Sequence, residues 1–349
     1  MLIGKKSTIG LDIGSRYLKV AQVDAGKDGY ELSLFSMLPV ERDVIGDGLV
    51  LNKTKLVDSL KALMSQAGIK KAEAVIGLSG HSAVITKVIK VPLITEEELG
   101  LNIKYEAEQY IPFDIKDVNI DFEILGQDSE EDGMMDVMLV AVKKSVMSDY
   151  VDVVQQAGLT PVVVDVDSFA IGNVYEVNYG FPDKKNIALV NIGASKTNIS
   201  ILRKGLPVFM RDTAIGSNYH TEAIERTLNI SKDAAERVKL GEAAEGISVD
   251  SVREIINGAS DEIYAEIYRS FEYFRSSVGD EDINGIVLSG GAALINGFAH
   301  LMSERLGIPV EVADVLKKIH KSERLAVNEI APITAVAVGL AMRRSGDRQ

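Results

Sequence analysis

Cysteine is absent from this chain of 349 residues, and histidine occurs only four times. The absence of cysteine excludes disulfides and thiolate metal sites, and it fits a reducing compartment. The histidines are His81, His220, His300 and His320, and none has a carboxylate or a cysteine at ligand spacing. Metal-binding and nucleophilic roles for histidine are therefore not expected.

Basic residues are fewer than acidic ones, 38 against 51, which gives a net charge of −13. No basic cluster exceeds a few residues, so nucleic-acid binding is not expected. No uncharged run reaches the ~18 residues that a membrane span needs. The N-terminus runs directly into a predicted strand, without the pattern of a signal peptide. We therefore expect a soluble, cytoplasmic protein.

One short pattern occurs twice, in residues 9–15 and 188–194: an apolar run, a short polar side chain, isoleucine, glycine and a small residue. Apolar alternation resumes after each copy, which predicts two hairpins with a glycine where the backbone approaches another group. A third glycine turn, in residues 286–292, follows a strand-like run and opens a helix. Amides in such turns bind anions. The three turns together predict a nucleotide held between two related halves.

The chain is long enough for more than one core, because single cores stop growing near ~250–300 residues. Strand-like and helix-like segments alternate, which indicates an α/β protein. Residues 84–164 read as strand, helix, two strands, helix and strand, and this pattern predicts an inserted small α+β domain. Residues 216–282 are predicted to be mostly helical. The expected lobe cores are residues 1–83, 165–185 and 330–349 for the first, and 186–215 and 283–329 for the second.

The chain resembles the superfamily of actin, chaperone and sugar-kinase ATPases in its two hairpins and its late glycine turn. Within that superfamily it is most similar to the PilM family of type IV pilus assembly proteins. The closest likeness lies in residues 10–19, 91–92 with 106–113 (EAEQYIPF), 165–170 and 266–270. The resemblance covers nearly the whole chain. It implies an actin-like fold of two lobes with ribonuclease-H-like topology, with ATP and Mg²⁺ in the cleft between them.

The resemblance also implies roles for the first hairpin and the second. Asp12 would face Mg²⁺ through water, and an Asp-x-Gly sequence is otherwise an ordinary hairpin turn. The other residues implied to contact phosphate are Gly14, Ser15, Lys19, Gly193, Ser195 and Thr197. The family's usual acid in the second hairpin is aspartate, whereas this chain has Asn191, which cannot accept a proton. Hydrolysis is therefore expected to be weak or absent.

Five further residues receive roles by the same resemblance. Asp167 matches a residue that orients the attacking water, and the alternative is a carboxylate that caps a helix. Glu236 and Lys239 lie three apart on a predicted helix and would hold the ribose and adenine, although such surface ion pairs are common. Gly290 and Gly291 would let the backbone approach the nucleoside.

The partner implied by the resemblance is the N-terminal cytoplasmic tail of the membrane protein PilN, held in a groove beside the small domain. Recruitment to the inner membrane through that tail is implied too, as are contacts with other pilus platform proteins and the assembly ATPases. Three alternatives remain. They are an FtsA-like cell-division filament protein, a cytoplasmic part of a type II secretion component, and a small-molecule kinase of the same fold.

Overall fold

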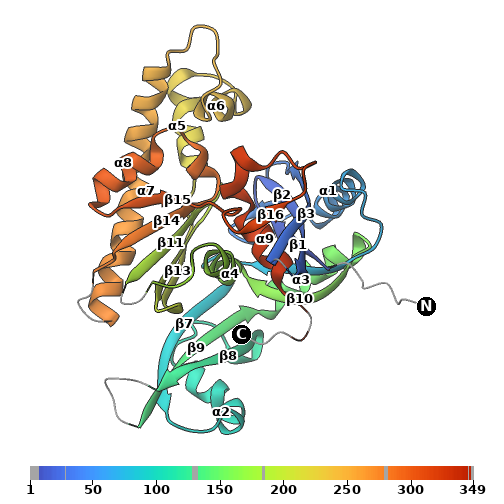
Figure 1. The fold of residues 1–349 in the computed structure, drawn as a ribbon, viewed down its shortest axis with the longest axis vertical. Helices are drawn as coiled ribbons and strands as arrows, with labels where there is room; N and C mark the ends of the chain where they lie inside the picture. Colours follow the sequence, from blue (N-terminus) through green and yellow to red (C-terminus); the bar gives the residue numbers. More distant parts are fainter. Residues whose placement is uncertain are drawn as a thin grey trace.

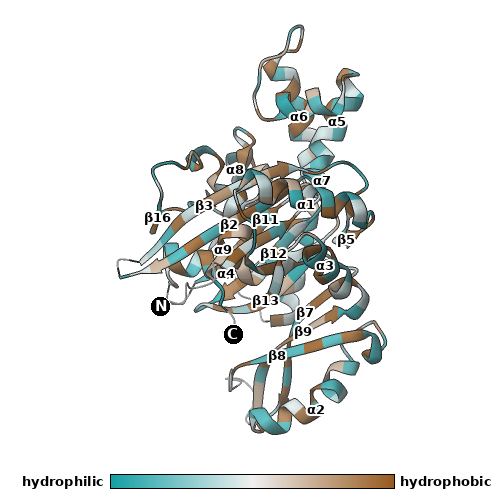
Figure 2. Ribbon diagram, turned by 90° about the vertical axis from the view of Figure 1, so that its right-hand side faces the viewer, coloured by the Kyte–Doolittle hydropathy of each residue, from teal (hydrophilic) through white to brown (hydrophobic). Residues whose placement is uncertain are grey.

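The computed structural model describes residues 8–27, 29–127, 133–182, 185–278, 282–344 and 346. Two twisted sheets lie side by side in the middle of the molecule (Figure 1). A helical region extends from one end, and a small domain extends from the other (Figures 1 and 2). In the described residues no helix is both long and apolar enough to cross a membrane.

The sheet of the first lobe has six strands in the order β10-β6-β1-β2-β3-β16. Strands β1 to β3 are antiparallel neighbours, whereas β6 and β10 run parallel to β1. The strands are β1 (Thr8–Ile13), β2 (Tyr17–Gly26), β3 (Gly29–Pro39), β6 (Glu73–Leu78), β10 (Thr160–Val166) and β16 (Ile319–Lys321), and a separate short pair is β4 (Ile45–Gly46) and β5 (Leu49–Val50).

The sheet of the second lobe repeats this topology in the order β13-β12-β11-β14-β15. Again the first three strands along the chain are antiparallel neighbours, and the next two are parallel to the first. The strands are β11 (Asn186–Ile192), β12 (Thr197–Arg203), β13 (Leu206–Thr213), β14 (Gly285–Ser289) and β15 (Val310–Val312). Two halves with the same strand order confirm the duplication that the repeated hairpins predicted.

Alternation along the strands places helices on both faces of the first sheet. Ile9 and Leu11 of β1 pack with α1 (Lys53–Gln66) and α3 (Lys144–Gln156) in one buried core. A second core contains the buried faces of α4 (Asp167–Tyr179) and α9 (Ala335–Met342), together with Leu189 and Leu202 of the second sheet. Helices α4 and α9 therefore lie between the two sheets, in agreement with their central position in Figure 1.

Two glycines allow α9 to pack directly against the backbone of its neighbours. A Cβ atom at Gly10 of β1 would lie 2.2 Å from the carbonyl oxygen of Ala337 in α9. A Cβ atom at Gly339 of α9 would lie 1.9 Å from the carbonyl oxygen of Ala170 in α4. Neither contact leaves room for a side chain, so α9 is fixed against both β1 and α4.

The small domain consists of a three-stranded sheet in the order β7-β9-β8 and one helix, with a hydrophobic core of its own. Helix α2 begins with the expected capping box, in which Thr95 and Glu98 bond each other's backbone amides. The elements are β7 (Val84–Pro92), α2 (Glu96–Glu108), the 3-10 turn Ile115–Asp117, β8 (Val118–Gln127) and β9 (Met134–Lys143).

The sequence-based range 84–164 differs from this arrangement at its C-terminal end. Strand β10 pairs with β6 in the first-lobe sheet, and α3 packs into the first-lobe core. The order strand, helix, two strands, helix and strand was read correctly, but its last two elements lie outside the three-stranded unit. Parallel pairing joins strands that are distant in sequence, and a local pattern does not reveal it.

The helical region contains α5 (Asn218–Leu228), α6 (Lys232–Lys239) and α7 (Val249–Val278), whose apolar faces join the core of the second sheet. The expected helix over residues 293–306 is divided in the structure. A 3-10 turn over Gly291–Leu294 is followed by α8 (Phe298–Leu306), because Gly297 has a φ of 78°. Likewise, α9 is shorter than its expected range, 333–343, and follows the 3-10 segment Asn328–Thr334 that contains Pro332.

Candidate functional site

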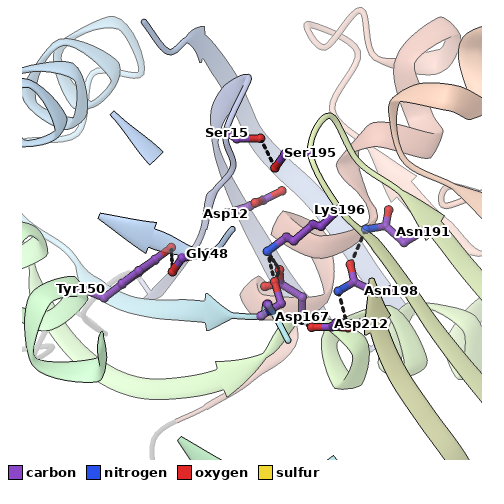
Figure 3. A network of polar contacts seen from close by, with 12 residues as sticks. Asp12, Ser15, Gly48, Tyr150, Asp167, Asn191, Ser195, Lys196, Asn198 and Asp212 are labelled. Carbon is purple, nitrogen blue, oxygen red and sulfur yellow. Dashed lines mark hydrogen bonds and ion pairs between the residues drawn. The ribbon is translucent and has the colours of Figure 1, made fainter. Parts of the chain in front are cut away.

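The two predicted hairpins face each other across the cleft between the lobes. Each closes with the same backbone bond: the amide of Gly14 donates to the carbonyl of Tyr17 at 3.2 Å, and the amide of Gly193 donates to that of Lys196 at 2.9 Å. The hydroxyl groups of Ser15 and Ser195 lie 2.8 Å apart, so the hairpins meet directly (Figure 3).

A pocket of about 190 Å³ lies between these hairpins and the third glycine turn. Ten of the residues that the sequence pointed to line it: Asp12, Gly14, Ser15, Lys19, Asp167, Asn191, Gly193, Glu236, Gly290 and Gly291. Most of its remaining surface is apolar or comes from Arg16, Lys196 and Ser217. The fold thus brings together both hairpins, the late glycine turn and helix α6 in one place.

Asp12 projects into this pocket beside Lys19, its register partner on β2. The ammonium of Lys19 bonds the carboxylate of Asp12. Burial raises the pKa of Asp12, and Lys19 opposes that rise. In the described part of the chain, no three His, Cys, Asp or Glu side chains form a group that could hold a metal ion. A single carboxylate nevertheless fits Mg²⁺ that binds chiefly through phosphate oxygens and water.

Lys196 is a pocket residue that the sequence reasoning missed. Its ammonium lies 3.2 Å from a carboxylate oxygen of Asp167 and also bonds the hydroxyl of Ser79, which itself bonds Asp167. Asp167 is the first residue of α4, whose N-cap is Val166, so the alternative role of Asp167 as a capping residue is wrong. Lys196 is the last residue of the turn in the second hairpin, at the position that Tyr17 holds in the first. This equivalent position was the only feature of the sequence that pointed to Lys196.

Asn191 belongs to a chain of hydrogen bonds that crosses between the lobes (Figure 3). Its amide nitrogen donates to the side-chain oxygen of Asn198 at 2.9 Å, and its oxygen accepts from Ser289 at 3.1 Å. The Asn198 amide donates to Asp212 at 2.7 Å, and Asp212 accepts from the backbone amide of Gly80 at 2.7 Å. Burial raises the pKa of Asp212, although Lys196 and these hydrogen bonds oppose the rise.

Glu236 and Lys239 form the expected pair on α6, but only Glu236 lines the pocket. The Lys239 ammonium is buried and lies 2.8 Å from Glu236, where it also bonds the hydroxyl of Thr221. Thr221 in turn donates to Glu236 at 2.7 Å. Burial alone would raise the pKa of Glu236, but Lys239 and Thr221 outweigh it, and the pKa is lowered. Lys239 therefore orients a charged Glu236.

The remaining predicted residues differ in what they touch. Thr197 lies outside the pocket lining, and its hydroxyl donates to the carbonyl of Ile215 at 2.8 Å, which supports the second hairpin. Gly290 has a φ of 86°, and a Cβ atom there would lie 2.4 Å from the carbonyl oxygen of Ile192. At Gly291 the nearest atom to such a Cβ would be the Ser217 hydroxyl, at 3.6 Å.

A second and larger cavity, of about 660 Å³, lies between the small domain and the first lobe. We call it the groove. It is lined by Glu96, residues 119–123, Met138, Val140, Val142, Met147, residues 164–166, Phe169 and Arg343. At one side Arg343 forms an ion pair with Asp165 at 3.1 Å. Burial raises the pKa of Asp165 to about 6, against the opposing effect of Arg343.

Comparison with known proteins places this geometry in a family. The model of the family "Type IV pilus assembly protein PilM" matches residues 10–345. The chain belongs to the PilM family. It is similar to a chain of the "PilM-PilN type IV pilus biogenesis complex", with 30% identity, a TM-score of 0.84, and coverage of 96% of this chain and 97% of that one. This PilM-family chain is therefore a type IV pilus assembly protein.

More distant similarities define the fold. The cell division protein FtsA of Pseudomonas aeruginosa is 25% identical over 97% of this chain and 89% of its own. The ethanolamine utilization protein EutJ of Carboxydothermus hydrogenoformans has a TM-score of 0.58, with 15% identity over 97% of this chain and 90% of its own. MreB5 of Spiroplasma citri bound to AMPPNP has a TM-score of 0.53, with 14% identity over 96% of this chain and 95% of its own. The two-lobed actin-like fold expected from the sequence is confirmed.

Proposed function

We propose that this chain is an ATP-binding adaptor of the pilus assembly machinery, and that its groove holds the N-terminal cytoplasmic tail of a PilN-type membrane protein. The observation that carries this proposal is the groove itself, in a chain that is 30% identical to the PilM of a PilM-PilN complex. The pocket and the groove are separate cavities. Nucleotide and tail would therefore occupy different sites on one molecule.

The amides of Gly14 and Gly193 close the hairpins, so phosphate oxygens would be bound by the backbone amides that follow these glycines and by the hydroxyls of Ser15 and Ser195. Asp12 would hold Mg²⁺ through water, and the ion would neutralise phosphate charge. Glu236, kept in place by Lys239, would face the ribose. Turnover would be slow, because Asn191 cannot accept a proton from water and Asp167 is already bonded to Lys196.

The glycine turn offers a test of the nucleotide site. Gly291→Val should fold, because space exists at that Cβ, yet its side chain would enter the pocket and weaken ATP binding at least about tenfold. Asp12→Ala should weaken Mg²⁺-dependent binding in the same calorimetric measurement. Gly290→Ala is the contrasting variant, because its Cβ would meet backbone and lower thermal stability. Unchanged ATP affinity in folded Gly291→Val and Asp12→Ala would rule out this nucleotide site.

The groove has the chemistry of a peptide site. Along β9, Val137, Leu139 and Ala141 point into the small-domain core, whereas Met138 and Val140 face the groove. Strand β8, at the edge of its sheet, forms another part of the lining. An extended tail could gain backbone hydrogen bonds from that edge and pockets for alternate apolar side chains. The acidic lining residues would favour a tail with positive charge.

Point variants test the groove better than deletion of residues 91–163, which would remove most of β10 from the first-lobe sheet. Val140→Arg places a charged side chain in the groove, and Leu101→Arg makes the same kind of change on the exposed face of α2, where Leu101 is 82% exposed. A synthetic tail peptide should bind wild type and Leu101→Arg but not Val140→Arg, while all three bind ATP. Equal peptide binding by the three proteins would remove the groove as the tail site.

The tail would also determine where the protein works. A chain without a membrane-spanning helix in its described residues can be held at the inner face of the membrane by a micromolar contact, because the tethered tail is locally concentrated. We extend the proposal to this peripheral location in the cytoplasm. Contacts with other platform proteins and the assembly ATPases would follow from the same position.

A further inference from the structure

Lys196 connects the two lobes inside the nucleotide pocket. It belongs to the second-lobe hairpin, and its partners Asp167 and Ser79 belong to the first lobe. The side chain of Lys196 is 17% exposed, and that of Asp167 is 9% exposed. An ion pair this deep in a pocket is held by direct contact and is little screened by salt.

The position of this ion pair within the pocket is informative. Glu236 and the turn at Gly290 lie at the side formed by α6 and β14, where the nucleoside is proposed to bind. The two hairpins meet at Ser15 and Ser195. Figure 3 shows Lys196 extending away from that meeting point, past Asp12, toward Asp167. A phosphate chain that passes between the hairpins would bring its last phosphate to the Lys196 ammonium.

The charge at this place also favours an incoming anion. Burial would lower the pKa of Lys196, but the neighbouring acidic groups, Asp167 before all others, outweigh burial and raise it, so the ammonium stays charged at neutral pH. One carboxylate oxygen of Asp167 accepts hydrogen bonds from both the Lys196 ammonium and the Ser79 hydroxyl. The Lys196 ammonium has three donors, two of which go to Ser79 and Asp167, so a phosphate can bind the third but shares the single positive charge with Asp167. A phosphate would compete with Asp167 for it.

We propose that Lys196 recognises the terminal phosphate of a nucleoside triphosphate and thereby gives this pocket a preference for triphosphate over diphosphate. The proposal rests on the proposed nucleotide site and adds its specificity. Asp167 opposes the preference because it competes for the same ammonium. The two residues therefore have opposite effects on the ratio of ATP affinity to ADP affinity.

The test is calorimetric titration of the full chain with ATP and with ADP. Lys196→Met should weaken ATP binding about tenfold, as expected for loss of a charge-assisted hydrogen bond, and change ADP binding less than about twofold. Asp167→Asn should strengthen ATP binding relative to ADP. The double variant Lys196→Met with Asp167→Asn does not leave Asp167 as a carboxylate without its ammonium, so it serves if the single lysine variant does not fold. Lys185→Met, at an exposed second-lobe lysine, is the control.

The ratio of ATP affinity to ADP affinity in these proteins decides whether Lys196 has this role. A lower ATP-to-ADP preference in the lysine variant and the double variant, together with a higher preference in Asp167→Asn, would establish the role. Equal changes for both nucleotides would show that Lys196 is structural and would overturn the inference. Equal ATP and ADP affinities in the wild type would overturn it while leaving the nucleotide site intact. Failure of the wild type to bind either nucleotide would overturn the proposed site as well.

Discussion

The side-chain amide of Asn191 donates a hydrogen bond of 2.9 Å to the side-chain oxygen of Asn198, its register partner across the second hairpin. In the first hairpin, the corresponding register partners are Asp12 and Lys19. An ion pair in one lobe thus corresponds to a neutral amide pair in the other. The second hairpin keeps the geometry of the first without its carboxylate.

The direction of the hydrogen bonds from Asn191 to Asn198 and from Asn198 to Asp212 predicts that Asn191→Asp destabilises the protein. Asn198 donates its amide to Asp212, so its oxygen must face residue 191. An aspartate there would place two acceptors in contact, and we expect the free energy of unfolding at pH 7 to fall by about 1–3 kcal/mol. Urea denaturation measures this loss.

A second substitution supplies the control. With Asp212→Asn added, Asn198 can reverse its amide and donate to the new carboxylate, while residue 212 still accepts from Gly80. The double variant should recover most of the lost stability, and ATP turnover, if the new carboxylate promotes it, should be measured there. No recovery would show that the cost of Asn191→Asp does not come from the direction of these hydrogen bonds.

The sequence predicted the features that depend on local pattern. The hairpins, the third glycine turn and the capping box at Thr95 each occupy a few consecutive residues, so their spacing was sufficient. The duplicated topology then followed from the repetition of the hairpin. The placement of Glu236 in the pocket, by contrast, came from family resemblance, because an ion pair three residues apart on a helix is common.

Features that depend on distant contacts were not accessible in this way. Lys196 meets Ser79 across 117 residues, and nothing in its own turn distinguishes it from a solvated lysine. The pairing of β10 with β6 likewise has no local signature. Thr197 fitted the phosphate loop by sequence, but the strand's register turned its hydroxyl toward the carbonyl of Ile215.

The contact between α9 and α4 predicts that a single added methyl group lowers the stability of the protein strongly. Gly339→Ala would drive a Cβ to within 1.9 Å of the carbonyl oxygen of Ala170, so the helices must separate. We expect a loss of about 3 kcal/mol or more in the free energy of unfolding. Gly172→Ala, in α4, is the matched control. No atom lies within 4 Å of its added Cβ, and replacing a helical glycine should add about 0.5–1 kcal/mol. Similar stabilities for the two variants would contradict this packing.

Asp165 predicts a dependence of stability on pH. Burial raises its pKa in the folded protein to about 6, whereas an unfolded aspartate titrates near ~3.9. Between these values the folded chain holds a proton that the unfolded chain has released, so unfolding releases a proton and stability falls as pH rises through the window.

Asp165→Asn removes this titration, while it also leaves Arg343 without its carboxylate at every pH. The difference between the free energies of unfolding of the wild type and of Asp165→Asn therefore isolates the contribution of the Asp165 titration. The free energy of unfolding of the wild type, relative to Asp165→Asn, should fall by about 2 kcal/mol between pH 4 and pH 7. Urea denaturation at closely spaced pH values measures it. A relative stability that rises with pH would mean that Arg343, rather than burial, controls this carboxyl group, and that the groove holds a charged Asp165 throughout the range.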